Sequence, residues 1–404
     1  MKIAFIVGSF PKLSETFILN QITGLIDKGH SVDIFAETKS NEKLMHSEVA
    51  QYNLLERASF VNIPSNKFYR KIKALYLAII NLYRAPIKIL RALNIIKYKD
   101  LGIFYRMLPL VNKKFDIVHC HFGPKGNTGI ILKDLGVLNG KILTSFYGYD
   151  ISSYINKDEN IYCKLFDKVD LMTVLSKDMK KKLINLGAPK NKILIHHLGI
   201  KPNRFKYKRK TFRKNTVKFL TVARLVEKKG LKYAVEAFSK VVNSIGSKKI
   251  QYDIVGDGPL KKELEEMVFH YKLQNSIKLW GWKNREEIIG MLNKAHIFIL
   301  PSVTAKNGDQ EGTPTVLLEA MAEGLPVIST YHSGIPEQVK NGKTGFLVPE
   351  KDTKSLTKKI KYLIEHPETW SGMGRKGREL VEKEFNINKL NDKLIEIYKN
   401  LVDK

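Results

Sequence analysis

Cysteine is scarce in this sequence of 404 residues, which has only Cys120 and Cys163. Neither belongs to a Cys-x-x-Cys pair, so the sequence indicates no zinc site and no disulfide framework. It also lacks an apolar run of about eighteen residues, the length needed to cross a bilayer. The first apolar run, residues 3–7, is too short for the core of a signal peptide. We therefore expect a cytoplasmic protein that contacts a membrane only peripherally.

Acidic residues are also in short supply. The sequence has 40 Asp and Glu against 69 Lys and Arg, a formal net charge of +29. Such an excess attracts anionic partners, which include nucleic acid, phosphorylated ligands and acidic membrane surfaces. A solvated basic surface without a partner is the alternative. With 43% hydrophobic and 27% charged residues, the composition is typical of a globular protein.

Short β-branched runs alternate with longer helical stretches along the whole chain, a pattern that predicts parallel sheets covered by helices on both faces. The predicted strands are residues 3–7, 31–36, 116–119, 142–146, 171–174, 193–197, 218–222, 252–255, 277–279, 297–300, 326–329 and 346–348. Twelve strands exceed one ordinary sheet. A polar, basic segment at 201–210 is the predicted linker between doubly wound domains at 1–200 and 211–375. Helices are expected over 376–404, the last of them packing on the first domain.

Two loops in the second half follow a predicted strand and precede a predicted helix, where open α/β sheets bind phosphates. The loop at 221–230 carries Arg224, Lys228 and Lys229, whose charges could neutralise a pyrophosphate. Solvated loop charge is the alternative. The loop at 255–260 (VGDGPL) is an incomplete glycine motif, which we interpret as structural support.

A third, longer polar loop precedes another predicted helix, with Thr313 as the expected N-cap and Pro314 as the first helical residue. Glu311 then lies just before the helix and Glu319 in its second turn. The carboxylates could accept hydrogen bonds from sugar and ribose hydroxyls, while the backbone N–H groups of Thr313 and Thr315 support phosphate charge. A surface loop with ordinary helix-start acids is the alternative.

Glu311 and Glu319 stand in a Glu-x7-Glu spacing, followed by AMAEGLPVIST and GIPE. Together with the segments at 224–230, 255–259, 279–282, 295–302 and 342–348, this spacing resembles the retaining GT-B glycosyltransferases of family 4. The first half is similar to a narrower group, the colanic-acid-type exopolysaccharide transferases, through FPKLSETFI (10–18), HCHFG (119–123) and SFYGYD (145–150).

The resemblance implies a GT-B fold, in which two doubly wound Rossmann-like domains face a central cleft. It implies sugar transfer from a nucleotide-diphosphate sugar to a glycan or lipid-linked acceptor, with retention of configuration, in exopolysaccharide, capsule or other cell-surface polysaccharide synthesis. The implied catalytic residues are Arg224 and Lys229 at the diphosphate and Glu311 at the transferred sugar. The implied donor-binding residues are Glu319 at the ribose, Gly312, Thr313, Thr315, Gly258 and Trp282 near the base. The implied acceptor-side or cleft residues are Ser14, Glu15, His121, Tyr147 and Asp150.

Tyr147 is a departure from the pattern, because the family usually has His in the place of this Tyr-Gly-Tyr-Asp tyrosine. Tyrosine can donate a hydrogen bond but carries no positive charge at neutral pH. His119 and His121 could compensate, although a structural role is the more common one for such histidines. No Asp-x-Asp motif stands out, so we expect no metal and no other cofactor.

Residues 66–99 form a basic stretch with nine Lys and Arg residues and no acid before Asp100. Leu, Ile and Tyr interleave at near-helical spacing, and Pro86 is expected to divide the stretch into two helices. This pattern predicts binding to an anionic membrane surface. A core-facing helix pair with basic solvent faces is the alternative.

Three other functions compete with sugar transfer. A nucleic-acid binder would account for the charge, but the sequence contains no recognised RNA- or DNA-binding module, and we expect no nucleic acid as partner. A nucleotide-sugar epimerase or a glycan phosphorylase would share the GT-B scaffold. The phosphorylase requires a lysine that holds pyridoxal phosphate, for which the sequence has no distinctive signal.

Overall fold

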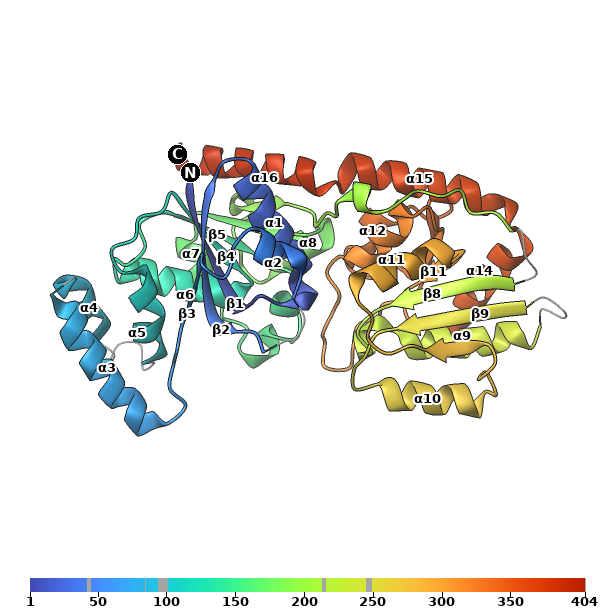
Figure 1. Ribbon diagram of the computed structural model, residues 1–404, viewed down its shortest axis with the longest axis horizontal. Helices are drawn as coiled ribbons and strands as arrows, with labels where there is room; N and C mark the ends of the chain where they lie inside the picture. The colour runs from blue at the N-terminus through green and yellow to red at the C-terminus, as the bar shows by residue number, and fades with distance from the viewer. Residues whose placement is uncertain (42–44, 84, 94–100, 213–215, 245–248, 404) are drawn as a thin grey trace.

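The computed structural model describes the chain except for residues 42–44, 84, 94–100, 213–215, 245–248 and 404 (Figure 1). Its strands form two parallel sheets. The first contains β1 (Lys2–Phe10), β2 (Ser31–Lys39), β3 (Ala58–Phe60), β4 (Ile117–His121), β5 (Lys141–Ser145), β6 (Leu171–Val174) and β7 (Ile193–Ile195). The second contains β8 (Thr216–Val222), β9 (Lys249–Val255), β10 (Ile277–Leu279), β11 (Ile297–Ile299), β12 (Val327–Thr330) and β13 (Gly345–Val348).

Both sheets are doubly wound. The first has the order β3-β2-β1-β4-β5-β6-β7 and the second the order β10-β9-β8-β11-β12-β13, so in each the chain reverses its direction of growth beside the first strand. Sheets of this kind bind ligands beyond the carboxyl ends of their strands, at the point of reversal. The ends of β1 and β4, and of β8 and β11, are therefore the places to look for a site.

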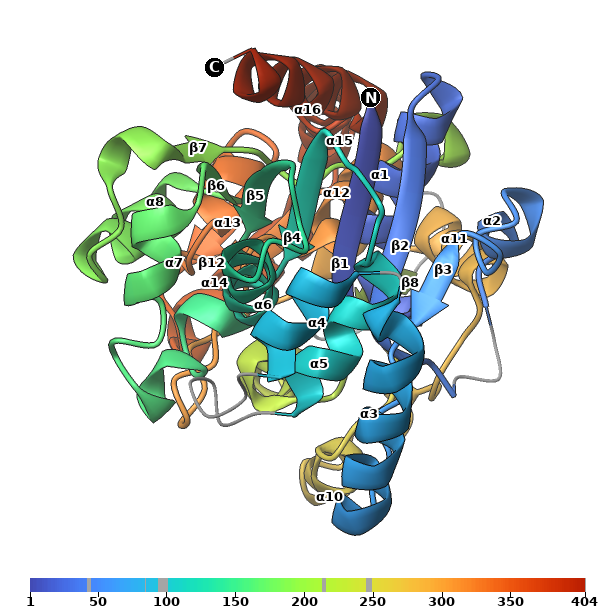
Figure 2. The same cartoon turned by 90° about the vertical axis from the view of Figure 1, so that its left-hand side faces the viewer.

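Helices cover both faces of each sheet (Figures 1 and 2). With the first sheet are α1 (Thr16–Asp27), α2 (Ser47–Gln51), α3 (Lys67–Leu82), α4 (Pro86–Leu93), α5 (Gly102–Met107), α6 (Gly123–Asp134), α7 (Cys163–Lys168) and α8 (Lys177–Asn185). With the second are α9 (Leu231–Val242), α10 (Lys261–His270), α11 (Arg285–Lys294), α12 (Thr315–Ala322), α13 (Ile335–Gln338), α14 (Thr353–Glu365) and α15 (Glu368–Glu384). The last helix, α16 (Ile387–Val402), returns to the first sheet.

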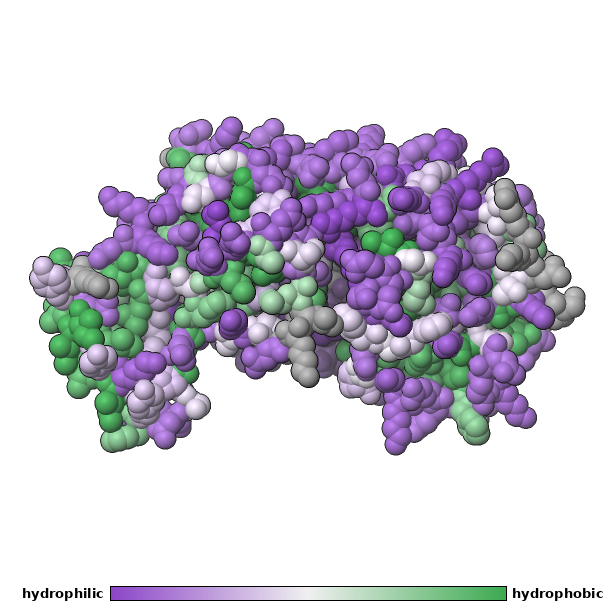
Figure 3. All heavy atoms as spheres, viewed as in Figure 1, coloured by the Kyte–Doolittle hydropathy of each residue, from purple (hydrophilic) through white to green (hydrophobic). Residues whose placement is uncertain are grey.

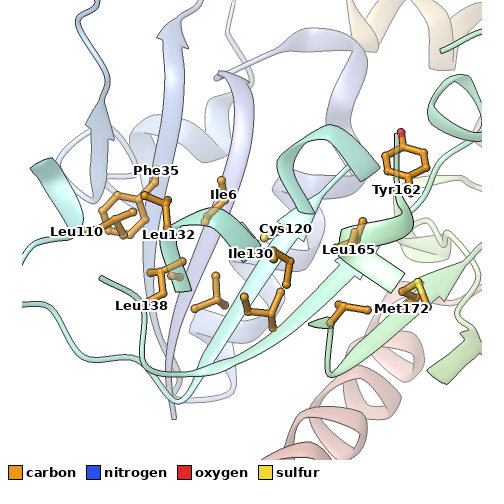
Figure 4. Close-up of a cluster of buried hydrophobic side chains, with 14 of the residues drawn as sticks. Ile6, Phe35, Leu110, Cys120, Ile130, Leu132, Leu138, Tyr162, Leu165 and Met172 are labelled. Carbon is orange, nitrogen blue, oxygen red and sulfur yellow. The ribbon is translucent and has the colours of Figure 1, made fainter. Parts of the chain in front are cut away.

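The first domain shows why its strands are apolar throughout. Side chains along a strand alternate between the two faces of a sheet, so a strand covered on both sides buries every residue. In β1, Ala4 and Ile6 join the cluster under α6, while Ile3 and Phe5 join the cluster under α1 and α16. Figure 4 shows the α6 side of this core. The two sheets are thereby held as rigid platforms for the loops at their carboxyl ends.

The chain crosses between the domains twice, and the two crossings are hydrogen-bonded to each other. Ile200, after β7, donates its backbone N–H to the carbonyl of Phe385 and accepts one from Ile387. Arg378 on α15 donates to the carbonyls of Pro202 and Phe205, which fixes the linker to that helix. The linker is therefore a packed segment rather than a loose tether.

Three expectations from the sequence need correction. β3 was not predicted, because a three-residue edge strand has too few residues to show a pattern. The expected domain end at 375 falls inside α15, which packs on α12 and so belongs with the second sheet. Pro314, with an extended backbone, is the N-cap of α12, which begins at Thr315 rather than with Thr313 as its cap.

Two expectations agree with the fold. Pro86 begins α4, after α3 has ended at Leu82, so the basic stretch forms two helices. The last helix packs on α1 of the first domain. Across the described part of the chain, no helix combines the length and the apolarity that crossing a membrane requires.

Candidate active site

A cavity of about 750 Å³ lies between the two domains, at the carboxyl ends of β1, β4 and β8. Both domains contribute to its wall, which includes Ser9, Lys12, Ser14, Glu15, Phe17, Lys125, Tyr147 and Tyr149 from the first, and Arg224, Lys228, Lys229, Asp309, Glu311, Thr313 and Thr315 from the second. The place is where the doubly wound topology puts a ligand site. Eight of the fourteen residues singled out in the sequence line this one cavity.

The loop after β8 brings three cations to the second domain's side of the cavity. Arg224 is exposed and lines the cavity, and Lys228 and Lys229 follow in a short 3-10 turn. Gly230 then turns the chain into α9 with φ of 65°. A Cβ at this position would lie 1.9 Å from the carbonyl oxygen of Pro301, so only glycine lets the cationic loop rest against the end of β11.

Lys229 and Glu311 form an ion pair at the centre of this wall. Their side chains are only 12% and 16% exposed, so each needs the other's charge. Burial alone would raise the pKa of Glu311, but Lys229 and Lys228 outweigh it and hold that pKa below its usual value. Glu311 is therefore ionised at neutral pH, and its carboxylate is a strong hydrogen-bond acceptor at the cavity.

Lys228 has a different task. Its ammonium lies 3.1 Å from a carboxylate oxygen of Asp309 and 3.3 Å from the carbonyl oxygen of Gln310. It joins the cationic loop to the polar loop that carries Glu311. Arg224, by contrast, has no ion pair with any residue that the structure describes, so its charge is available to a ligand.

The start of α12 supplies backbone donors to the same wall. Thr313 and Thr315 line the cavity, and their backbone N–H groups have no acceptor among the described residues. The first N–H groups of a helix carry a partial positive charge and favour anions. With Arg224 and Lys229 beside them, they form a cradle suited to a phosphate group.

His332 is a site residue that the sequence analysis missed. It is 1% exposed, and its Nε2 accepts a hydrogen bond of 2.9 Å from the backbone N–H of Glu311. Its Nδ1 lies 2.6 Å from Glu350, whose other oxygen accepts from the N–H of Thr304. His332 thus fixes the backbone that carries Glu311. Its position just after β12 could have identified His332 as a site candidate, because the carboxyl ends of parallel strands lie at the same edge of the sheet as the cavity.

The first domain forms the opposite wall. Ser14 and Glu15 lie in the 3-10 turn Leu13–Glu15 and line the cavity, where Glu15 pairs with Lys12 at 2.8 Å. Tyr147, after β5, lines it as well. Its two lysines, Lys12 and Lys125, are each paired with a glutamate, so among the residues that the structure describes this wall has no free cation to match Arg224.

Tyr147 is held by a histidine beneath it. Its hydroxyl lies 2.7 Å from Nδ1 of His121, which is fully buried and stacked on His119. Burial lowers the pKa of His121 to about 3, so the pair is neutral at physiological pH. His121 therefore does not restore the positive charge that a histidine at 147 could carry. It orients the tyrosine from outside the cavity.

Asp150 is also behind the wall, not in it. Its buried carboxylate accepts hydrogen bonds from the backbone N–H groups of Gly123, Tyr147 and Gly148, at 2.9 to 3.0 Å. These bonds close the turn that presents Tyr147. The expected cleft position of His121 and Asp150 is thus corrected to a supporting one, because neither lines the cavity and each bonds to the turn that carries Tyr147.

Four expected donor-binding residues do not line the cavity. Gly258 packs its backbone on Leu225 and supports the cationic loop, while Trp282 is 49% exposed in the loop after β10. A Cβ at Gly312 would lie 2.3 Å from the carbonyl oxygen of Tyr147, so this glycine lets the two domains touch. Glu319 lies one turn into α12, and its burial raises its pKa despite the charges of Arg285 and Arg204.

Within the described parts of the chain, no three His, Cys, Asp or Glu side chains gather closely enough to hold a metal ion. The charges at the cavity that could face a phosphate are those of side chains and of the helix start. The arrangement can bind a phosphorylated ligand against one domain and a second molecule against the other.

Two doubly wound sheets that face one cavity define the GT-B class of glycosyltransferases. Family models place the chain within that class: the one described as Glycosyltransferase Family 4 matches residues 14–204, and the one described as Glycosyl transferases group 1 matches residues 203–380. The chain belongs to glycosyltransferase family 4, and it is a glycosyltransferase.

Named relatives cover the whole chain. WcaL of Salmonella typhimurium, named for colanic acid biosynthesis, is 36% identical over 415 residues, which span 99% of this chain and all of that protein. AmsK of Erwinia amylovora, named for amylovoran biosynthesis, is 36% identical over 409 residues, with the same coverage. The resemblance seen in the motifs is therefore confirmed along the full length.

Solved structures confirm the fold. HepE from Anabaena in complex with UDP superposes with a TM-score of 0.72 at 16% identity, covering 99% of this chain and 100% of that one. Sucrose-phosphate synthase from Thermosynechococcus elongatus gives 0.70 at 19% identity, covering 99% of both chains. At such identities the likeness concerns the fold alone.

We predict that Lys229→Ala lowers kcat/KM for sugar transfer at least about 100-fold, the usual effect of removing one group that stabilises a transition state. Glu319→Ala should lower kcat/KM by a similar factor, because the donor would lose its expected ribose contact. The measurement is initial-rate kinetics, with the melting temperature as the check on folding. Lys232→Ala, which removes a surface ion pair with Glu263 on the neighbouring helix, is the matched control. A variant that folds and turns over at the wild-type rate would remove its residue from the site.

We predict that His332→Phe lowers kcat about 10- to 100-fold, because the N–H of Glu311 loses its buried acceptor and the loop loses its position. His332→Gln, whose amide oxygen can accept that bond, should recover part of the loss. His366→Phe disrupts an exposed His–Glu pair and serves as the control. Equal kcat in His332→Phe and the wild type would contradict a positioning role.

Proposed function

We propose that this enzyme transfers a sugar from a nucleotide-diphosphate sugar to a glycan or lipid-linked oligosaccharide acceptor, with retention of anomeric configuration. One observation carries the proposal. Arg224, Lys229 and the free backbone N–H groups of Thr313 and Thr315 meet at one cavity wall, where the diphosphate of a donor would lie. The second domain then binds the donor and the first binds the acceptor.

The chemistry needs a stabilised leaving group. As the bond from the anomeric carbon to the diphosphate breaks, negative charge develops on the departing oxygen and an oxocarbenium-like sugar forms. Arg224 and Lys229 stabilise the negative charge on that oxygen with their positive charges, and the start of α12 adds oriented N–H donors. These groups are in place before reaction, so little reorganisation is needed at the moment of bond breaking.

Glu311 supports retention without acting as a nucleophile. Its ionised carboxylate is paired with Lys229, which lowers its availability for a covalent step, and it can accept hydrogen bonds from sugar hydroxyls. Attack by the acceptor on the same face that the diphosphate leaves accounts for retention. We propose that Glu319, near the start of α12, binds the ribose of the donor.

The acceptor is proposed to be a growing exopolysaccharide, capsular or other cell-surface glycan. The names of WcaL and AmsK, which match the whole chain, favour exopolysaccharide synthesis. If the acceptor is lipid-linked, a place at the cytoplasmic face of the membrane suits the enzyme. We propose that the basic residues between 66 and 99 make that peripheral contact.

We predict that one nucleotide-diphosphate sugar from a panel raises the melting temperature, because a ligand that binds only the native state at 100 times its Kd adds about 2.7 kcal/mol of stability. The same donor should release nucleoside diphosphate only when an acceptor is present. The anomeric proton coupling in the NMR spectrum of the product should then show retention.

Two results would count against transfer. Conversion of the donor to an isomer without an acceptor-linked product would indicate an epimerase. Dependence on orthophosphate and a glycan, with no use of nucleotide sugars, would indicate a phosphorylase. Inversion at the anomeric carbon would contradict only the proposed stereochemistry.

We predict that dialysis against EDTA leaves the transfer rate within about twofold, since fixed cations here take the part that a metal plays in other phosphate chemistry. The measurement is the initial rate before and after chelation. A loss that added Mg²⁺ or Mn²⁺ restores would show that the donor is bound through a metal.

A further inference from the structure

The helices α3 and α4 form a hairpin at the end of the first domain that is farthest from the second (Figures 1 and 2). α4 packs on α5, and α3 packs on α4. Tyr105 on α5 donates its hydroxyl to the carbonyl of Arg70 at 2.6 Å, which fixes the start of α3 to the body. The hairpin is thus an attached element with one face left to the outside.

Its inner face is made of small and aliphatic residues. Ala74 and Ala78 of α3 and Ile89 of α4 are buried and join the main cluster of the first domain. Ala74 and Ala78 are four residues apart and so share one side of α3. This inner face docks the hairpin on the body of the first domain.

The outer face is also apolar, which folding does not require. Large hydrophobic side chains of the hairpin are 41% to 96% exposed: Phe68, Tyr69, Ile72, Leu75, Tyr76, Ile79, Ile80, Leu82, Tyr83, Ile87 and Leu90. Figure 3 shows hydrophobic surface gathered over these two helices. Contiguous exposed apolar surface of this kind marks a place of interaction. The sequence-based alternative, a helix pair with basic solvent faces, does not describe this surface.

The arrangement around α3 is regular. At about 100° per residue, Phe68, Ile72, Leu75, Ile79 and Tyr83 fall on one side of the helix, about 120° around its axis from the buried alanines. Lys71 and Lys73 lie at the two borders of this exposed apolar side, whereas Lys67 and Arg70 lie in the first turn, toward the alanines. Lys71 and Lys73 therefore flank the exposed apolar face on both of its edges.

The charge is of one sign. Between Arg57 and Lys99 the sequence has no Asp or Glu, while the described part of the hairpin adds Lys88 and Arg91 from α4. An apolar face bordered by Lys and Arg matches the two layers of an anionic bilayer surface, with acyl chains for the face and phosphate headgroups for its edges. Long basic side chains reach such headgroups while their stems lie on apolar surface.

We propose that the α3–α4 hairpin inserts its exposed apolar face into an anionic lipid bilayer, so that it anchors the enzyme by burial as well as by charge. This inference deepens the proposed function, on which its biological purpose rests, by naming the element and the mode of attachment. Adsorption through charge alone would need no apolar face on the side away from the core.

A second copy of the chain fits this surface less well. Two hairpins docked by their apolar faces would bring their flanking cations together with no acid on either side to offset them, and like charges across an interface are costly. An RNA or DNA partner would use the cations but leave the aliphatic face in water. The bilayer satisfies both features together.

The first test compares sedimentation of the full chain with vesicles of phosphatidylcholine alone and of an equal mixture of phosphatidylcholine and phosphatidylglycerol. The wild type should bind the mixed vesicles. The double variant Leu75→Gln/Ile79→Gln should bind them at least about tenfold more weakly, since each lost CH₂ contributes to membrane affinity. Phe269→Gln on α10 changes an equally exposed hydrophobic residue on the other domain and should bind as the wild type.

The second test separates insertion from adsorption. Ile79→Trp should show a blue-shifted emission with the mixed vesicles and quenching by brominated lipid, whereas Phe269→Trp should show neither. In the Ile79→Trp background, Lys71→Gln/Lys73→Gln should weaken binding and reduce its salt dependence without abolishing the blue shift at saturating lipid. Binding of Leu75→Gln/Ile79→Gln equal to the wild type, or Ile79→Trp without a shift on bound protein, would overturn the proposal.

Two further measurements distinguish failure of the membrane-anchor proposal from failure of the proposed sugar-transfer function. Transfer to a short water-soluble acceptor should be unchanged in Leu75→Gln/Ile79→Gln, because these residues lie outside the cavity. If no nucleotide sugar supports transfer but the wild-type protein inserts into the mixed vesicles, the proposed function is wrong and the proposed membrane anchor is supported. If light scattering shows a dimer that the variant loses, with no vesicle binding, the occupant is a second copy and the anchor is wrong.

Discussion

The buried ion pair between Lys229 and Glu311 is the interaction on which the site depends. It joins the loop after β8 to the loop before α12, two segments about eighty residues apart in the sequence. Because both charges are largely removed from water, neither side chain can leave without stranding the other. The pair therefore sets the distance between the cationic loop and the helix start, and with it the width of the phosphate cradle.

Several neighbouring residues hold the two loops that carry this pair in position. Gly230 lets the cationic loop rest on the end of β11, Lys228 fixes the second loop through Asp309, and His332 holds the backbone of Glu311. None of these needs to touch a substrate. Their cost in folding freedom is small because they rise from strand ends that the sheet already holds. The second domain's wall thus has its charges in place without a ligand, whereas the cations of the first domain's wall, Lys12 and Lys125, are each paired with a glutamate.

The sequence was informative where burial dictates residue type. All twelve predicted strands are present, since β-branched runs covered on both faces leave little choice. Arg224 and Lys229 were singled out because they follow such a strand, and Glu311 because it precedes a predicted helix; all three line the cavity. The residues that the sequence analysis misjudged are those whose role depends on contacts between distant parts of the chain. Asp150 resembled a cleft acid until its three backbone hydrogen bonds placed it behind the wall, and His332 looked like any single histidine.

The same limit applies to the α3–α4 hairpin. Its sequence shows apolar and basic residues at helical spacing, which fits either a core-facing pair or a membrane-facing one. Only the structure shows that Ala74 and Ala78 complete the packing and that the larger side chains point outward. A chain with 29 excess positive charges then has two distinct proposed uses for them: buried or cavity-facing cations for a diphosphate, and exposed cations around an apolar face for a lipid surface. If both proposals hold, one molecule keeps its phosphate-binding cavity close to a lipid-linked acceptor.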